Sequence, residues 1–340
     1  MTVSRLLVTD ITLRDGNHAV AHQLTKHQLS VYAAASDAAG VSIIEVGHGN
    51  GLGASSLQVG EALLTDAEMF KAVRSVLKTA RMSIHVIPGF ATINKDLRPA
   101  IEAGVDVIRV ASHCTEADIT ERHITFAREQ GKEVYGVLMM SHMAPKEVLL
   151  EEARKMEQYG AEGVVLMDSA GAYLPVDVRE KIGHLAAGLS IPVGFHAHNN
   201  LGLAVGNALA AAESGAYIID GAARGFGAGA GNAQLEAIVA VFRKMGYDTG
   251  IDLYKMLDAA DICERELVEV MPSAKSTSIV SGLSGVFSAF SKPVDRVAKE
   301  YGVDPRDVFF ELGRRGVVAG QEDIIIEVVR ELAEKGARDE

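Results

Sequence analysis

Two short segments, far apart in the sequence, carry most of the side chains that could do chemistry. They are TLRDGNH (residues 12–18) and HAHNN (residues 196–200). Alternate residues of an extended strand lie on one face, so His196 and His198 are expected to point the same way. Two imidazoles and one carboxylate, for which Asp15 is the candidate, form a ligand set for a divalent cation that leaves positions open for water and substrate. From ligand type alone, Mn²⁺, Mg²⁺, Zn²⁺ and Fe²⁺ all remain candidates.

Three further side chains near these segments could act on a substrate. Arg14 has a permanent charge and forked donors, which suit a carboxylate or a developing enolate oxygen. His18 can exchange protons near neutral pH. Ser169, in the segment DSAGA, offers a hydroxyl to a substrate oxygen or, alternatively, caps a helix. No lysine stands at the end of an expected strand, so a metal-assisted enolate is favoured over a Schiff base.

Eight apolar, β-branched runs alternate with helical patterns and would position these residues. Continuous hydrophobicity predicts strands buried on both faces, as in a parallel sheet. The alternation over about 250 residues predicts an α/β fold, a TIM (β/α)₈ barrel whose active site lies at the carboxyl ends of the strands. An open doubly wound sheet is the alternative, but no glycine-rich phosphate turn follows the first run. The expected strands cover residues 6–13, 41–47, 82–89, 105–112, 132–140, 163–169, 192–198 and 217–223.

The alternation stops near residue 250, and a small C-terminal all-helical domain is expected beyond it. We place the barrel at residues 1–262 and the helical domain at residues 263–340. The stretch 271–285 is rich in small residues and is expected to be irregular. In DPRDVFF, Asp304 is expected to cap a helix whose first turn contains Pro305. The glycine-rich loop 225–231 follows the last strand, where a barrel often binds anionic groups on backbone amides.

The composition of the chain argues against nucleic acid and membrane as binding partners. The chain has 340 residues, of which 48% are hydrophobic and 23% charged, an ordinary globular balance. Its 33 basic and 45 acidic residues give a net charge of −12, which argues against nucleic acid. No run approaches the roughly 20 apolar residues of a membrane span. Two cysteines and an amino terminus without an apolar signal core predict a cytoplasmic location with no membrane association.

Longer motifs resemble a known family. TLRDG with HAHNN resembles the metal-dependent barrel family of hydroxymethylglutaryl-CoA lyase, isopropylmalate synthase and 4-hydroxy-2-oxovalerate aldolase. Further segments are similar to the 4-hydroxy-2-oxovalerate aldolase branch over nearly the whole chain. These segments are EVGHGNGLGASS (45–56), ASHCTEAD (111–118), LMMSHM (138–143), MDSAGA (167–172), GAGAGNAQLE (227–236) and GQEDII (320–325).

The resemblance implies a class II pyruvate aldolase, a carbon–carbon lyase of aromatic-compound catabolism. Its divalent metal, typically Mn²⁺ with Mg²⁺ and Co²⁺ as alternatives, would be held by Asp15, His196 and His198. The substrate, a 2-oxo acid, would chelate this metal. His18 would remove the proton of the 4-hydroxyl group, Arg14 would stabilise the enolate of pyruvate, and Ser169 would help to hold the substrate. Such enzymes usually form homo- or hetero-oligomers and pass a volatile aldehyde to an acylating aldehyde dehydrogenase.

Departures from the family pattern lie around the substrate tail. Phe287 replaces a tyrosine that helps to position the reacting hydroxyl, and His85 replaces a leucine in the third strand. Ala319 replaces a glycine before Gly320. The changes at Phe287 and His85 predict a pocket for a longer or more polar aldehyde, and Ala319 predicts a narrower exit for the aldehyde toward a partner. Two alternatives remain: an acyl-CoA-dependent Claisen-type synthase or lyase, and a chiefly structural subunit of a dehydrogenase complex. The glycine-rich loop lacks the cysteine that the lyase branch uses.

Overall fold

Eight parallel strands close into a barrel in the computed structural model, which describes residues 4–339. Each strand pairs with its sequence neighbours, and β1 closes the ring by pairing with β8, with Leu7 opposite Ile218. The predicted (β/α)₈ barrel is therefore confirmed, with strand ends shifted by up to three residues. The strands are β1 (Leu7–Leu13), β2 (Ile43–Val46), β3 (Arg81–Val86), β4 (Val107–His113), β5 (Glu133–Met139), β6 (Val164–Asp168), β7 (Val193–Ala197) and β8 (Ile218–Gly221).

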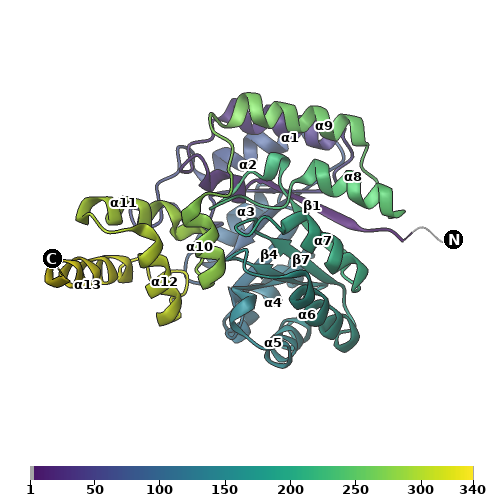
Figure 1. Ribbon diagram of the computed structural model, residues 1–340. Helices are drawn as coiled ribbons and strands as arrows, with labels where there is room; N and C mark the ends of the chain where they lie inside the picture. The colour runs from purple at the N-terminus through teal and green to yellow at the C-terminus, as the bar shows by residue number, and fades with distance from the viewer. Residues whose placement is uncertain (1–3, 340) are drawn as a thin grey trace.

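Helices follow the strands and cover the outside of the barrel (Figure 1). Two of them begin with reciprocal side-chain capping: Thr25 with Gln28 in α1, and Thr65 with Glu68 in α2. Their apolar faces pack on the outward side chains of the strands and form the large core of the molecule. The helices are α1 (Lys26–Ala38), α2 (Asp66–Arg74), α3 (Arg98–Glu102), α4 (Glu121–Glu129), α5 (Lys146–Gln158), α6 (Pro175–Gly188), α7 (Ala204–Glu213) and α8 (Leu235–Met245).

The inside of the barrel changes from apolar to charged along the strands. Side chains two positions apart in a strand share a face, so each strand supplies successive layers of the interior. Three strands place an apolar residue in the lower layer and a charged one above it: Ile43 and Glu45 in β2, Val107 and Arg109 in β4, and Ile218 and Asp220 in β8. The charged layer therefore lies toward the carboxyl ends of the strands, where the site was expected.

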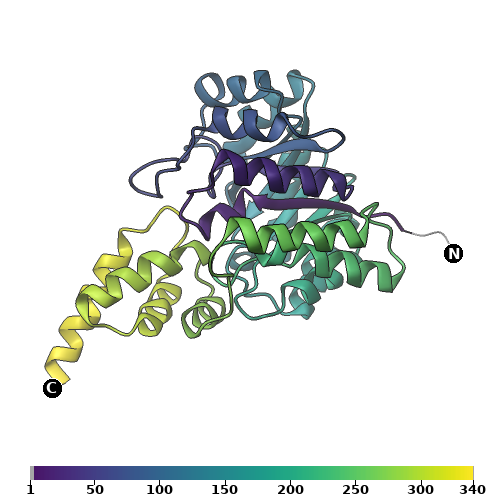
Figure 2. The ribbon, with the colours of Figure 1, turned by 90° about the horizontal axis from the view of Figure 1, so that it is seen from above.

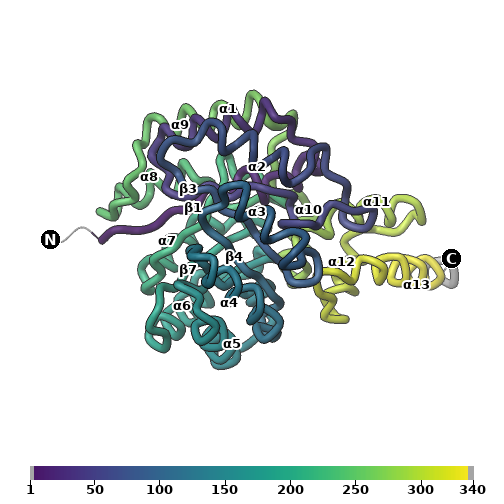
Figure 3. The backbone as a smooth tube through the Cα atoms, turned by 180° about the vertical axis from the view of Figure 1, so that it is seen from behind, coloured from purple at the N-terminus to yellow at the C-terminus, as the bar shows by residue number. Residues whose placement is uncertain are grey.

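The C-terminal helices form a separate body beside the barrel. Helix α9 (Leu253–Ile262) packs against α1 and α8, whereas α10 (Ser276–Ser284), α11 (Ser291–Tyr301), α12 (Pro305–Arg315) and α13 (Ile324–Asp339) have their own apolar core. Figures 1 and 3 show this body on the side opposite the start of β1, and Figure 2 shows the same arrangement from above. Because the strands are parallel, the helical body lies toward their carboxyl ends. Within residues 4–339, no helix is long and apolar enough to cross a membrane.

The boundary between the two bodies can be placed by their cores. Cys263 and Leu267 belong to the apolar core of the barrel, and Val286 belongs to that of the helical body. The change of core therefore lies after the predicted boundary at residues 262–263. The outermost ends of the two predicted domains, residues 1–3 and 340, lie outside the described residues.

The prediction that residues 271–285 are irregular was wrong, because this stretch contains helix α10. Tertiary packing, rather than helix propensity, explains this helix. Gly282 faces the barrel so closely that an added Cβ would lie 3.0 Å from side-chain atoms of Asn200 and Leu201. The small residues that look like a loop in the sequence thus allow a close approach. The predicted start of α12 is confirmed: Asp304 caps the helix and Pro305 is its first residue.

Candidate metal centre and active site

The structure brings Asp15, His196 and His198 together at the carboxyl ends of the strands. Asp15 begins a short 3₁₀ turn (Asp15–His18) after β1, His196 lies in β7, and His198 follows the end of that strand. All three side chains are buried, and their ligand atoms lie within 4.8 Å of one another. The Nε2 atoms of the two histidines are 3.4 Å apart, and Nε2 of His198 is 3.9 Å from a carboxylate oxygen of Asp15.

The protonation of these groups fits a divalent cation. Asp220 accepts a hydrogen bond from Nδ1 of His196 at 3.0 Å, which leaves the Nε2 lone pair free toward His198. Burial lowers the pKa of His198 to about 4, so its ring is neutral at pH 7. Burial opposes ionisation of Asp15, but attraction to Arg14 and the nearby histidines lowers its pKa well below the usual value. The site therefore offers the Nε2 atoms of two imidazoles and one carboxylate, a ligand set that suits a divalent metal.

The glycine-rich loop 225–231 closes on the carboxylate of Asp15. The backbone amide of Ala228 donates to Oδ1 of Asp15 at 3.3 Å, and the side-chain amide of Asn232 donates to the same atom at 2.7 Å. An added Cβ at Gly227 would lie 2.7 Å from this oxygen, so only glycine fits there. The anionic group held by this loop is thus a side chain of the protein itself. Its effect is to aim the second oxygen of Asp15 at the two histidines.

Arg14 lies beside this cluster and is held by two carboxylates. Its Nη1 atom donates to Asp15 at 2.7 Å, and its Nε atom donates to Glu45 at 2.6 Å. Its Nη2 atom is buried and has no hydrogen-bond partner among the described residues. Leaving a buried guanidinium N–H unpaired is costly, so this donor suits an oxygen that arrives with the ligand.

A chain of buried opposite charges connects Arg14 to His196. Glu45 bonds Arg14 with one oxygen and Arg109 with the other at 3.1 Å. Arg109 also donates to Asp220 at 2.5 Å, and the same oxygen of Asp220 holds His196. The side chains of this chain are at most 3% exposed. We expect the network to fix both the guanidinium and the imidazole, because a shift of one charge would leave its neighbours unpaired.

Sequence reasoning missed Glu45, Arg109 and Asp220. The signal was present, because each is a lone charged residue inside an otherwise apolar strand, in IIEV, VIRV and IID. A charge at such a position is buried and therefore needs a partner of opposite sign. With one residue of this kind on each of three strands, mutual pairing inside the barrel is the expected solution.

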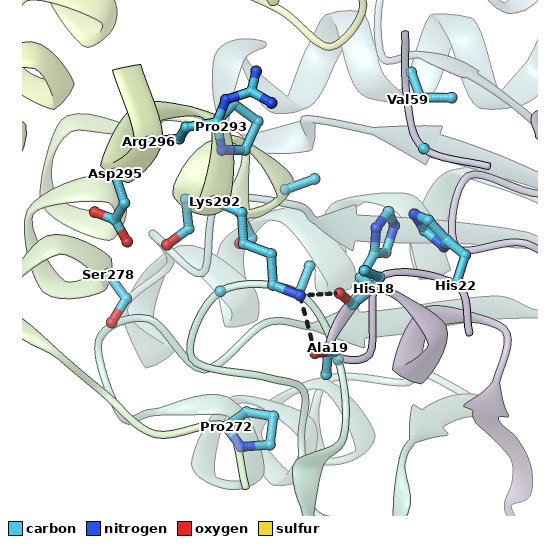
Figure 4. Close-up of a pocket in the computed structure, with 18 of the residues that line it drawn as sticks. His18, Ala19, His22, Val59, Pro272, Ser278, Lys292, Pro293, Asp295 and Arg296 are labelled. Atoms are coloured by element: carbon cyan, nitrogen blue, oxygen red, sulfur yellow. Dashed lines mark hydrogen bonds between the residues drawn. The ribbon is translucent and has the colours of Figure 1, made fainter. Parts of the chain in front are cut away.

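His18 lines a cavity of about 590 Å³ that lies between the barrel and the helical body. Its ring packs so closely on Gly49 that an added Cβ there would lie 2.6 Å from the ring. Burial lowers the pKa of His18 to about 4, which makes the ring a neutral proton acceptor at pH 7. Figure 4 shows His18 and His22 on one side of this cavity and Lys292, Asp295 and Arg296 on the other.

Ser169 bonds the residue next to Phe287, where the helical body contacts the barrel. The hydroxyl oxygen of Ser169 accepts a hydrogen bond from the backbone N–H of Met140 at 2.9 Å, so Ser169 is not a helix cap. Its carbonyl oxygen accepts bonds from the N–H and the hydroxyl of Ser288 at 3.0 and 2.7 Å. Phe287, next in the chain to Ser288, is half-buried and packs edge-on against Phe290. Ser169 thus helps to place the segment that carries Phe287.

His85 lies inside the barrel, in β3, with Arg109 beside it in β4. The side chain is 2% exposed, and Nδ1 is buried without a hydrogen-bond partner among the described residues. Burial, followed by repulsion from Arg14, lowers the pKa of His85 well below its usual value. A neutral, polar ring with an unused nitrogen therefore stands near the guanidinium of Arg14.

Comparison with known proteins agrees with this geometry. A model described as HMGL-like matches residues 5–263, and one described as a DmpG-like communication domain matches residues 272–334. Proteins named 4-hydroxy-2-oxovalerate aldolase from Spirochaeta aurantia and Pectobacterium atrosepticum are each 63% identical to the chain. The first alignment covers 98% of both chains, and the second covers 97% of this chain and 96% of the relative.

A solved structure shows the same fold at much lower identity. The carboxyl transferase domain of Rhizobium etli pyruvate carboxylase is 16% identical and superposes with a TM-score of 0.81, over 98% of this chain and 61% of that one. At this low identity the likeness lies in the fold, so it adds to the sequence matches an observation of a different kind. Two matching domain models and relatives that align from end to end place the chain in one family. The chain belongs to the 4-hydroxy-2-oxovalerate aldolase family.

Proposed function

We propose that this protein cleaves a 4-hydroxy-2-oxo acid, 4-hydroxy-2-oxovalerate or a longer or more polar homologue, to pyruvate and an aldehyde. The observation that carries this proposal is the convergence of a buried metal-ligand set, an arginine with a free N–H and a neutral histidine. A divalent metal held by Asp15, His196 and His198, for which we propose Mn²⁺, would polarise the 2-oxo group and offset negative charge as it develops.

The protein's own groups supply the remaining steps. His18, which is neutral, takes the proton of the 4-hydroxyl group. The C3–C4 bond then breaks, the aldehyde leaves, and the bond's electron pair forms the enolate of pyruvate. Nη2 of Arg14 donates to the oxygen on which this charge develops, at no cost of reorganisation because Glu45 and Asp15 already hold the guanidinium. Protonation of the enolate at C3 gives pyruvate, and this proton balances the one that His18 removed from the 4-hydroxyl group.

The helical body is proposed to bind a partner. The match to a DmpG-like communication domain supports an acylating aldehyde dehydrogenase as that partner, in a homo- or hetero-oligomeric complex. The cytoplasm is the proposed location. Ala319 lies between α12 and α13, in the helical body that would contact the partner.

The acyl-CoA alternative lacks a reactive thiol in the structure. Cys114 and Cys263 are both buried, and neither lies in the glycine-rich loop. Burial raises the pKa of Cys114 to about 12 and raises that of Cys263 further, so both remain protonated thiols at pH 7. No second function is favoured by a specific observation.

A direct assay tests the proposed reaction. The protein is freed of metal with a chelator and assayed for pyruvate release from 4-hydroxy-2-oxopentanoate. We expect activity to disappear with the metal and to return on addition of Mn²⁺, with Mg²⁺ and Co²⁺ tested in parallel, because the ligand set itself does not choose among these ions. Undiminished cleavage after complete metal removal would contradict the metal-dependent mechanism, and thiol release from acetyl-CoA would favour the Claisen-type alternative.

The residues around the substrate tail predict a changed aldehyde preference. His85→Leu and Phe287→Tyr are expected to shift the ratio of kcat/KM toward acetaldehyde, relative to longer or polar aldehydes, by about tenfold each, the usual effect of one pocket group. The measurement is condensation of pyruvate with a panel of aldehydes. His123→Leu on α4 and Phe310→Tyr on the exposed face of α12 are the matched controls. If the ratio moves no further than in these controls, the two residues do not select the aldehyde.

A further inference from the structure

Lys292 reaches from the helical body to the main chain of the proposed base. It lies in the first turn of α11, and its ammonium group donates to the carbonyl oxygens of His18 at 2.9 Å and Ala19 at 3.0 Å. Figure 4 shows these two bonds as dashed lines from the nitrogen of Lys292 to the oxygens of His18 and Ala19. The helical body thus contacts the catalytic segment itself and not only the rim of the barrel.

The charge of Lys292 is directed at these carbonyl groups. His18 is the last residue of the 3₁₀ turn that begins at Asp15, and cations are favourable at the carboxyl end of a helical turn. In the part of the chain that the structure describes, no carboxylate forms an ion pair with Lys292, and burial alone lowers the pKa of its ammonium group. Asp295, one turn further along α11, also lines the cavity, but it forms no salt bridge with Lys292.

The backbone that follows His18 is strained, so it depends on stabilising contacts such as the hydrogen bonds from Lys292. Ala21 and His22 have φ angles of +53° and +65°, in the left-handed region that residues with a Cβ seldom adopt. Two consecutive residues of this kind persist only where surrounding contacts fix them. The backbone N–H of Ala21 bonds the carbonyl oxygen of His18, the same atom that Lys292 holds.

The ring of His18 is supported separately, from the barrel side. It contacts Gly49 and the edge of the His22 ring, whose centroid is 5.1 Å away, and His22 in turn stacks on His48 at 3.6 Å. His22 also accepts a hydrogen bond from the N–H of Gly49 at 3.3 Å. The imidazole is therefore placed by two supports: packed rings and Gly49 on one side, and Lys292 on its main chain on the other.

Other bonds keep the helical body in place when Lys292 is changed. Nε2 of His142 bonds the carbonyl oxygen of Gly285 at 2.8 Å, Ser288 bonds Ser169, and Asn200 donates to the hydroxyl of Ser288 at 2.9 Å. All of these partners lie at the carboxyl ends of β5, β6 and β7. A change at Lys292 therefore tests the hold on His18 without detaching the helices.

We propose that Lys292 is a positioning residue for His18, which keeps the imidazole where it can take the proton of the 4-hydroxyl group. The proposal rests on the proposed role of His18 as the base. The hydrogen bonds of Lys292 go to the carbonyl oxygens of His18 and Ala19 and not to the metal-ligand set, so it acts through the backbone of this segment.

A second substrate can distinguish the contribution of the base from that of the metal site and Arg14. Oxaloacetate is a 2-oxo acid that loses CO₂ by cleavage of its C3–C4 bond and yields the same enolate of pyruvate. It has no 4-hydroxyl proton to remove, so its decarboxylation uses the metal site and Arg14 but not His18. The experiment measures kcat for aldol cleavage and for oxaloacetate decarboxylation, at saturating Mn²⁺, in the full-length protein and in Lys292→Met, Lys292→Arg, His18→Ala and Lys299→Met. Lys299 is an exposed lysine on the same helix and is the matched control.

We expect Lys292→Met to lower kcat for aldol cleavage by about tenfold, since a small misplacement of a catalytic group has an effect of this order. Decarboxylation should change by less than about twofold, Lys292→Arg should recover most of the loss, and Lys299→Met should match the unaltered protein in both reactions. An equal loss of both reactions in Lys292→Met would overturn the inference in favour of a general structural role, and so would unchanged cleavage. Should His18→Ala retain cleavage, the assignment of the base fails, and the inference fails with it. Loss in His18→Ala with no loss in Lys292→Met would overturn the inference alone.

Discussion

Replacement of His196 by alanine is expected to abolish tight binding of a divalent metal and to lower the rate of aldol cleavage by about a thousandfold or more, because a metal supplies several kcal/mol of charge stabilisation. His196 is the better fixed of the two histidine ligands, because Nδ1 of His198 has no hydrogen-bond partner among the described residues. Asp220 orients its ring, and its Nε2 atom lies 3.4 Å from that of His198. Without it, Asp15 and His198 provide only two ligands, too few for a firm site.

The measurement for this variant has two parts. Bound metal is quantified by elemental analysis after dialysis against Mn²⁺, and pyruvate release is measured over a range of added Mn²⁺. His27→Ala, an exposed histidine on α1, serves as the control and should bind metal and turn over normally. Retention of one tightly bound metal per chain by His196→Ala would show that the proposed ligand set is wrong.

Replacement of Arg109 by methionine should both destabilise the protein and weaken the metal site. Arg109 is 1% exposed and is held by Glu45 and Asp220, whose carboxylates would be left buried without their partner. Removal of one partner from a buried ion pair typically costs about 3–5 kcal/mol of the free energy of unfolding. Asp220 would also be free to move away from His196, and loss of a group that orients a ligand typically lowers metal affinity by about 10–100-fold.

A surface ion pair provides the contrast. Arg74 pairs with Asp106 at 3.0 Å, and both side chains are about one-third exposed, so Arg74→Met should lower the free energy of unfolding by about 1 kcal/mol at most. Urea unfolding gives the stability of both variants, and titration calorimetry with Mn²⁺ gives the affinity. If Arg109→Met binds Mn²⁺ as tightly as Arg74→Met does, the buried network does not orient the metal site.

The barrel was predictable because its physical signals are local and strong. Eight apolar runs of strand length, each followed by a helical pattern, extend over about 250 residues. This number of repeats and this length leave few folds other than a (β/α)₈ barrel. The metal-ligand candidates were also predictable, because His196 and His198 share a strand face and the carboxyl ends of parallel strands meet at one side. The proposed roles of Arg14 and His18 rest on the family resemblance together with the chemistry of an arginine and a histidine beside a metal site.

Features that depend on long-range packing were not predictable from local patterns. Helix α10 was missed because its stability comes from the close contact of Gly282 with the barrel. The bond from Lys292 to the backbone of His18 joins residues 274 positions apart, and nothing in either segment indicates it. The network of Glu45 and Arg109 was visible only as isolated charges, whose partners depend on the register of the closed ring.

The closure of β1 against β8 has a consequence for how the protein is made. Asp15 is synthesised some 180 residues before His196 and His198, and the oxygen that orients His196 belongs to the last strand of the barrel. Firm metal uptake should therefore not precede completion of the ring, and an ion that binds only the finished barrel favours it over partly assembled forms by mass action. Capture of a divalent metal would then mark the last step of assembly.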